Sequence, residues 1–168
     1  QGAGGPALTL EYERGLRDRL RALLGTRRED WSDAVAEAAR DCTLVHVWAV
    51  AALLLKARMK AERIDIIGFH GQTINHCPEQ GWSWQIGDGA LLATQTGIDV
   101  IADFRSSDLA AGGQGAPLAP LYHGALAAKM EKPLAVLNLG GVANVTWIGS
   151  GENEILAFDT GPGNALMD

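Results

Sequence analysis

A short apolar run that ends in a charged, glycine-rich loop constrains this sequence more than any other feature. Residues 98–102 are apolar enough for a strand buried on both faces. Asp103, Arg105 and Asp108 follow within six residues, and the glycine-rich stretch 112–115 comes next. Open α/β sheets bind ligands at the carboxyl ends of their strands, so the pattern predicts an α/β fold with a site here. A surface loop whose Asp and Arg side chains pair with each other would give the same residues.

Composition narrows the class of protein. The 168 residues are 47% hydrophobic, which is enough to build a core, and the net charge of -6 has no acidic or basic blocks. We therefore expect a soluble protein without a nucleic-acid surface. Cys42 and Cys77 give neither a disulfide framework nor a metal-binding spacing, which fits the cytoplasm. The apolar run 44–55 is too short for a membrane span, and a chain that begins with Gln1 is expected to be incomplete.

The first 60 residues have helical periodicity. An amphipathic helix is predicted over 8–24, followed by a polar connector over 26–30. A second helix should start after Ser32 and run to about Lys60. We expect His46, on its apolar stretch, to be a buried, hydrogen-bonded histidine rather than a ligand.

Two more strands end in polar residues. The apolar segment 64–69 leads into His70, Gln72 and Thr73, and a turn there is the alternative interpretation. A strand over 82–87, whose tryptophans we interpret as structural, and a short helix over 90–96 follow. After a helix over 121–130, a three-stranded antiparallel meander is predicted over 134–139, 142–148 and 154–158. Its last strand should end at the polar segment 159–164, and a helix should begin at residue 165.

Five ordered motifs together resemble the 1,6-anhydro-N-acetylmuramic acid kinase family. They are His70–Thr73, Gln85–Asp88, Asp103–Leu118, Asn138–Asn144 and Asp159–Asn164. The resemblance implies a mixed sheet with flanking helices in a ribonuclease-H-like domain of the actin-like ATPase group, followed by the first antiparallel strands of a second such domain. It also implies that ATP and Mg²⁺ are used to open the 1,6-anhydro ring and phosphorylate O6 in murein recycling.

The same resemblance divides the chain and assigns the site. Residues 1–132 should be most of the first domain and residues 133–168 the start of the second, with a homodimer left open. We expect this segment alone to be inactive, since one phosphate loop and the nucleotide pocket of the family do not match any part of it. Asp159 is the candidate catalytic base. No metal-ligating residue is expected.

The remaining candidate residues fall into two groups. The sugar-binding candidates are His70, Gln72, Thr73, Asp103, Arg105, Asp108, Gly112, Gly113 and Gln114. The candidates on the phosphate and nucleotide side are Asn138, Gly140, Gly141, Asn144, Gly161, Gly163 and Asn164. For Asp108, sugar binding and an internal structural role stay equally open.

Two rival functions remain at this point. One is another sugar kinase of the same fold, in which the aspartate deprotonates a hydroxyl instead of water. The other is a non-catalytic sugar-binding or regulatory module. Product analysis with the free sugar and its anhydro form distinguishes the first rival from an anhydro-sugar kinase.

Overall fold

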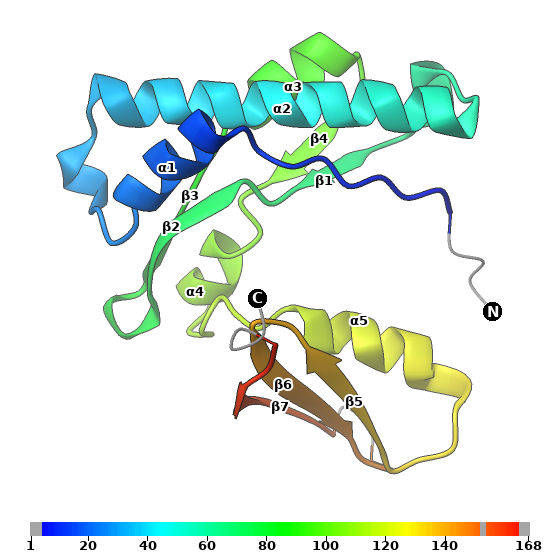
Figure 1. Cartoon of the computed structure of the whole chain (residues 1–168). Helices are drawn as coiled ribbons and strands as arrows, with labels where there is room; N and C mark the ends of the chain where they lie inside the picture. Colours follow the sequence, from blue (N-terminus) through cyan, green and yellow to red (C-terminus); the bar gives the residue numbers. More distant parts are fainter. Residues whose placement is uncertain (1–4, 152–153, 165–168) are drawn as a thin grey trace. The chain divides into compact units, whose positions relative to one another are not determined.

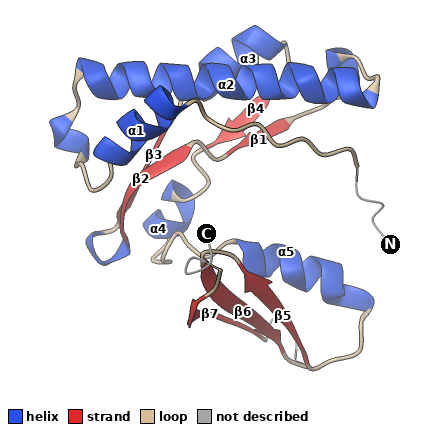
Figure 2. Cartoon of the chain, viewed as in Figure 1, coloured by secondary structure: helices blue, strands red, loops and turns tan. Residues whose placement is uncertain are grey.

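The computed structural model describes residues 5–151 and 154–164, and within them it is a mixed α/β structure with one parallel and two antiparallel sheets (Figures 1 and 2). The chain divides into two compact units, residues 1–115 and 116–168. The predicted boundary at residue 132 is a boundary between two domains of a longer protein. The two units do not test it, so it stays a prediction. The predicted helix from residue 165 lies outside the described residues.

The first unit contains four α-helices and three single turns of 3₁₀ helix within its described residues. They are α1 (Arg14–Ala22), η1 (Arg28–Asp30), α2 (Asp33–Ala57), η2 (Ala61–Arg63), η3 (Pro78–Gln80), α3 (Gly89–Thr96) and α4 (Ser106–Ala110). The predicted helix over 8–24 is shorter than expected, because Leu8 and Leu10 are exposed and the buried contacts begin at Leu16. Without tertiary packing a short helix gains little stability.

Two separate strand pairs complete this unit. β1 (Ile67–Phe69) pairs in parallel with β4 (Val100–Ala102), and β2 (Gln72–Cys77) pairs antiparallel with β3 (Trp82–Ile86). The expectation of a strand buried on both faces at residues 98–102 is wrong for the described structure. Ile98 is buried there, but Ile101 is 51% exposed, because β4 has only β1 as a hydrogen-bonded neighbour.

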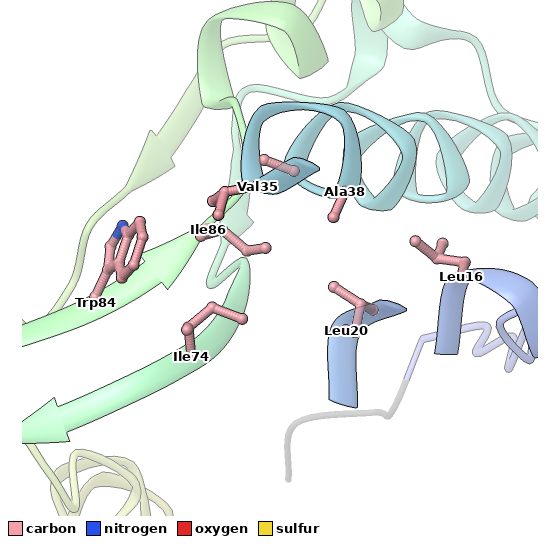
Figure 3. Close-up of a cluster of buried hydrophobic side chains, with 8 residues drawn as sticks. Leu16, Leu20, Val35, Ala38, Ile74, Trp84 and Ile86 are labelled. Atoms are coloured by element: carbon pink, nitrogen blue, oxygen red, sulfur yellow. The ribbon is translucent and has the colours of Figure 1, made fainter. Parts of the chain in front are cut away.

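The core of the first unit lies between the helices and the β2–β3 hairpin. Side chains from α1, α2, β2 and β3 converge there (Figure 3). They include Leu16, Leu20, Val35, Ala38, Ile74, Trp84 and Ile86. The burial of Trp84 at 3% exposure confirms that this tryptophan is structural.

Helix α2 is long and apolar enough to cross a membrane by length and composition alone. Its amino-terminal half supplies buried core residues such as Val35 and Cys42, but only 22% of its most apolar 18-residue window is buried, and Leu55 is exposed. His46 is half-buried, and its ring Nδ1 lies 2.8 Å from the Cys42 carbonyl oxygen. The expected hydrogen-bonded histidine is therefore confirmed.

The second unit is the predicted meander with a helix against it. Its elements are α5 (Ala119–Leu126), η4 (Ala127–Lys129), β5 (Leu134–Leu139), β6 (Val142–Ile148) and β7 (Ile155–Pro162). The order β5–β6–β7 confirms the predicted antiparallel sheet. The His123 ring lies 2.9 Å from the Thr146 hydroxyl and ties α5 to β6. Strand β7 continues to Pro162, so the expectation that this strand ends before Asp159 is wrong.

Candidate functional site

A cavity of about 210 Å³ lies in the first unit where β1 and β4 end. It is lined by Arg28, Phe69, His70, Gly71, Ser83, Gln85, Ile86, Gly87, Ala102 and Asp103. Phe69 and Ala102 are the last partners of the parallel pair, so the residues that follow them, His70 and Asp103, emerge side by side. Two of the predicted strand ends therefore meet in one cavity, as expected for the carboxyl edge of parallel strands.

Asp103 leaves β4 in an unusual backbone conformation. Its φ of 56° is in the left-handed region, which non-glycine residues adopt rarely and Asp tolerates better than most. The Ser106 hydroxyl donates a hydrogen bond of 2.6 Å to Asp103 Oδ1 and holds the carboxylate in this turn. Backbone strain of this kind is often kept at functional sites, which favours a ligand-binding role for Asp103.

Arg105 fixes the protonation pattern of the His70 ring. The guanidinium of Arg105 lies 3.1 Å from His70 Nε2, and a guanidinium can only donate, so Nε2 must accept. His70 Nδ1 lies 2.9 Å from the Gly71 carbonyl oxygen and therefore carries the proton. Burial lowers the pKa of the Arg105 guanidinium from its usual value, but arginine stays charged in proteins. These contacts orient the His70 ring between the Arg105 guanidinium and the Gly71 carbonyl oxygen.

Polar side chains on the hairpin support one wall of the cavity. Gln85 Nε2 donates to the Ser83 hydroxyl at 2.7 Å and to the Thr73 hydroxyl at 3.3 Å. The His76 ring lies 2.9 Å from the same Ser83 hydroxyl. Thr73 therefore contacts Gln85, which lines the cavity, but does not line the cavity itself. Gln72 is also outside it and lines a separate groove beside α1.

Asp108 anchors the glycine-rich loop and does not line the cavity. The Gly115 N–H donates to Asp108 Oδ2 at 2.7 Å, and the Gly113 N–H donates to the Asp108 carbonyl at 2.8 Å. A Cβ at residue 113 would overlap the Asp108 carboxylate, which would then have to move. These contacts favour the structural interpretation of Asp108, while Gly112 and Gln114 are exposed on the same loop.

In the second unit, Asp159 lies within β7 rather than after it. It is exposed and pairs with Asn144 of β6, whose other neighbour across the sheet is Asn138 of β5. Next along β7, Ala143 pairs with Gly161, so Thr160 is an extra residue and forms a bulge. Bulges change the direction of neighbouring side chains and are frequent beside active sites.

The β5–β6 turn packs closely against the residues that follow β7. The Gly163 and Asn164 N–H groups donate to the carbonyls of Gly141 and Gly140, each at 2.9 Å. A Cβ on Gly163 would overlap the Gly140 carbonyl oxygen. Asn164 Oδ1 is buried and accepts no hydrogen bond from the described residues. All the candidates of the phosphate side therefore lie on β5, β6 or β7, in the β5–β6 turn, or in the segment after β7.

Sequence reasoning missed Arg28 and Ser83, which also line the cavity. Arg28 comes from the expected polar connector, and nothing in its spacing distinguishes it from neighbouring arginines. Ser83 could have been found, because strand alternation over 82–86 places Ser83 on the opposite face from Trp82 and Trp84. Across residues 5–151 and 154–164 no three His, Cys, Asp or Glu side chains gather as a metal site.

Comparisons with known proteins agree on one family. A family model described as anhydro-N-acetylmuramic acid kinase matches residues 7–168. A protein of that name from Rhizorhabdus wittichii is 61% identical over 137 residues, which is 82% of this chain and 38% of the relative. Proteins of the same name from Paramagnetospirillum magneticum and Rhodospirillum rubrum are each 54% identical over 164 residues, or 98% of this chain. The chain spans 44% and 43% of these two relatives, less than half their length.

Proposed function

The chain belongs to the anhydro-N-acetylmuramic acid kinase family, and on this premise we propose that it is the sugar-binding part of such a kinase. The observation that carries the proposal is the family match over residues 7–168. The full-length protein would use ATP to open the 1,6-anhydro ring of anhydro-N-acetylmuramic acid and to phosphorylate O6. The product would be N-acetylmuramic acid 6-phosphate, an intermediate of cell-wall recycling.

The reaction couples two bond changes. Water attacks the anomeric carbon, the bond from that carbon to O6 breaks, and O6 attacks the γ-phosphorus of ATP while ADP leaves. Water is a weak nucleophile, so a carboxylate must take its proton, and we assign this role to Asp159. The exposed position of Asp159 beside a β-bulge supports the assignment. Phosphoryl transfer itself needs alignment and charge neutralisation more than covalent help from the protein.

Sugar binding is assigned to the cavity of the first unit and its surroundings. Asp103 would accept hydrogen bonds from sugar hydroxyls, and His70, oriented by Arg105, would provide a further polar contact. Gln72, Thr73 and Asp108 do not line the cavity, so they would affect sugar binding indirectly. Gln72 and Thr73 would act through the β2–β3 hairpin, and Asp108 would act through the glycine-rich loop. The loop residues Gly112, Gly113 and Gln114 would let the backbone approach the sugar.

Phosphate binding is assigned to the β5–β6 turn and the end of β7. Backbone N–H groups of glycine turns bind anions without lysine side chains, and Gly140, Gly141, Gly161 and Gly163 provide such turns. Mg²⁺ would neutralise phosphate charge when bound, and it is usually held by substrate phosphates with one or two protein oxygens. Among the described residues, the unpartnered Asn164 Oδ1 is an oxygen that fits this requirement.

Several finer features belong to the same proposal. The two units would be parts of two ribonuclease-H-like domains of the actin-like ATPase group, divided near residue 132. The protein would be cytoplasmic and would bind the sugar and ATP without a nucleic-acid or membrane partner, with a homodimer left open. The antiparallel meander that opens at Leu134 supports the start of a second domain.

Two conservative variants test the assignment of the base. In a protein of the relatives' full length that contains this chain, Asp159→Asn should lower kcat by about 10²–10⁴-fold, the usual contribution of general-base catalysis, with little change in KM for the sugar. Asp103→Asn should instead raise KM for the sugar and leave substantial turnover at saturation.

The outcomes are distinct. Near-normal turnover by Asp159→Asn, or loss of turnover only in Asp103→Asn, would put the base at the other residue. Phosphorylation of free N-acetylmuramic acid but not of the anhydro sugar would replace the proposal with an ordinary sugar kinase. Sugar binding without turnover of ATP would replace it with a binding module.

A further inference from the structure

One charged side chain that lines the cavity of the first unit, Arg28, has no role in the proposed function so far. Arg28 of η1 lines it together with His70 and Asp103. Among the described residues, no carboxylate lies within ion-pair distance of Arg28. Its neighbour Arg27 differs, because Arg27 pairs with Glu29 at 3.6 Å and does not line the cavity. Arg28 therefore has a charge that is free to meet a ligand.

Backbone contacts just before Arg28 set its position. The Gly25 N–H donates to the Ile74 carbonyl at 3.0 Å. The Asn75 side-chain amide donates to the carbonyls of Gly25 and Thr26 at 3.0 and 3.2 Å. These bonds fasten the start of the connector to strand β2. The start of the connector is thus tied to β2, although residues 27–30 themselves are exposed.

An aromatic contact fixes the chain just after Arg28. The rings of Trp31 and Trp84 lie 6.1 Å apart between centroids, at an angle of 42°. Trp84 is buried in β3, the strand that also supplies Ser83 and Gln85 to the cavity. Because the chain is held on both sides of it, Arg28 is directed at the cavity with little backbone freedom to lose on binding.

The other charged side chains near the cavity are placed differently. Asp103 accepts from the Ser106 hydroxyl, and Arg105, which donates to His70, does not line the cavity. A ligand that brings one carboxylate would find its natural partner in Arg28, since a guanidinium binds a carboxylate through two parallel hydrogen bonds. The proposed substrate carries one carboxylate, on the lactyl ether that distinguishes muramic acid from glucosamine.

We infer that Arg28 binds the lactyl carboxylate and selects the acid-bearing anhydro sugar over the same sugar without its lactyl group. The inference rests on the proposed function and adds a specificity-determining residue to it. Arg28 touches no reacting atom in this role, so its loss should act on KM for the sugar and not on kcat.

The test compares two substrates and three variants in a protein of the relatives' full length that contains this chain. The substrates are anhydro-N-acetylmuramic acid and 1,6-anhydro-N-acetylglucosamine, which lacks the lactyl group. Arg28→Ala should raise KM for the acid about 10- to 100-fold, as expected for loss of a charge-assisted hydrogen-bond pair, and should leave KM for the neutral sugar nearly unchanged. Arg28→Lys should recover part of the loss, and Arg27→Ala should match the wild type.

Three results would overturn the inference: an equal rise in KM for both sugars, a rise in KM for ATP alone, or no change. The second would mean that Arg28 meets nucleotide phosphate. Direct binding of each sugar, measured by calorimetry, separates this inference from the proposed function. Wild-type protein that binds the acid through Arg28 but phosphorylates neither sugar would refute the proposed function and keep the inference, whereas binding of neither sugar would refute both.

Discussion

The loop anchored by Asp108 allows a sharp test, because the structure predicts that two substitutions in it are not additive. Asp108→Ala removes the acceptor of the Gly115 N–H, a bond of 2.7 Å to a half-buried carboxylate. A hydrogen bond to a charged group contributes about 1.5–3 kcal/mol, and we take the lower end, about 1.5 kcal/mol, because this carboxylate is partly solvated. Opening of the loop should then become about tenfold more frequent.

Gly113→Ala should break the same bond by a different route. A Cβ at residue 113 would lie 2.6 Å from Asp108 Cγ and overlap its oxygen, so the carboxylate must move away. Its cost should be about 1–3 kcal/mol, as for other overpacked sites. Once Asp108 is alanine the obstacle is gone, and Gly113→Ala should add less than about 0.5 kcal/mol, which leaves a coupling of about 1–2 kcal/mol.

Amide hydrogen exchange of Gly115 measures this coupling directly. Gly112→Ala is the matched control, because its φ of +88° strains an alanine while its Cβ would meet no atom within 4 Å. The control should cost about 1–2 kcal/mol and should add independently to Asp108→Ala. If the destabilising effects of Gly113→Ala and Asp108→Ala also prove additive, Asp108 does not anchor the loop. Sugar binding would then again be an open interpretation of Asp108.

Further predictions concern other contacts of the described residues. Gly163→Ala should destabilise the second unit by about 1–3 kcal/mol, measured by amide hydrogen exchange of β6, because its Cβ would overlap the Gly140 carbonyl. Gly15→Ala, in open space on α1, should instead stabilise the first unit by about 0.5–1 kcal/mol, measured in the same way on α2. Equal effects would contradict the steric argument. Burial raises the pKa of the Cys42 thiol above its usual 9.0, so only the unfolded chain ionises as the pH rises through that value, and the free energy of unfolding should fall there. Cys42→Ala should reduce this fall in denaturant titrations between neutral pH and pH 10, and an unchanged slope would exclude Cys42 as its source.

Local patterns in the sequence predicted the second unit well, and the reason is physical. Apolar segments over 134–139 and 142–148 with a Gly–Gly turn between them favour a hairpin, and both strands have the predicted bounds. The polar segment 159–164, which follows an apolar run, predicts that the strand ends before Asp159. Pairing with β6 overrides that local signal and extends β7 to Pro162.

The candidate site was predictable only where strand topology determines it. His70 and Asp103 follow two strands that pair in parallel, so their meeting in one cavity follows from a general property of such sheets. Arg28 reaches the same cavity through contacts between residues about 50 positions apart, such as Asn75 with Gly25. No periodicity or motif reports contacts of that kind, so only the structure could reveal this arginine.

The different surroundings of the two aspartates give a physical reason for their different proposed roles. Asp103 is held by the Ser106 hydroxyl in a left-handed turn, so one of its oxygens is occupied and its position is fixed. Such a carboxylate suits the orientation of hydroxyl groups. The Asp159 carboxylate is exposed and accepts no hydrogen bond from the described residues, so its lone pairs remain available to take a proton from water. A base must be free to change its protonation state, and of the two carboxylates Asp159 meets that requirement better.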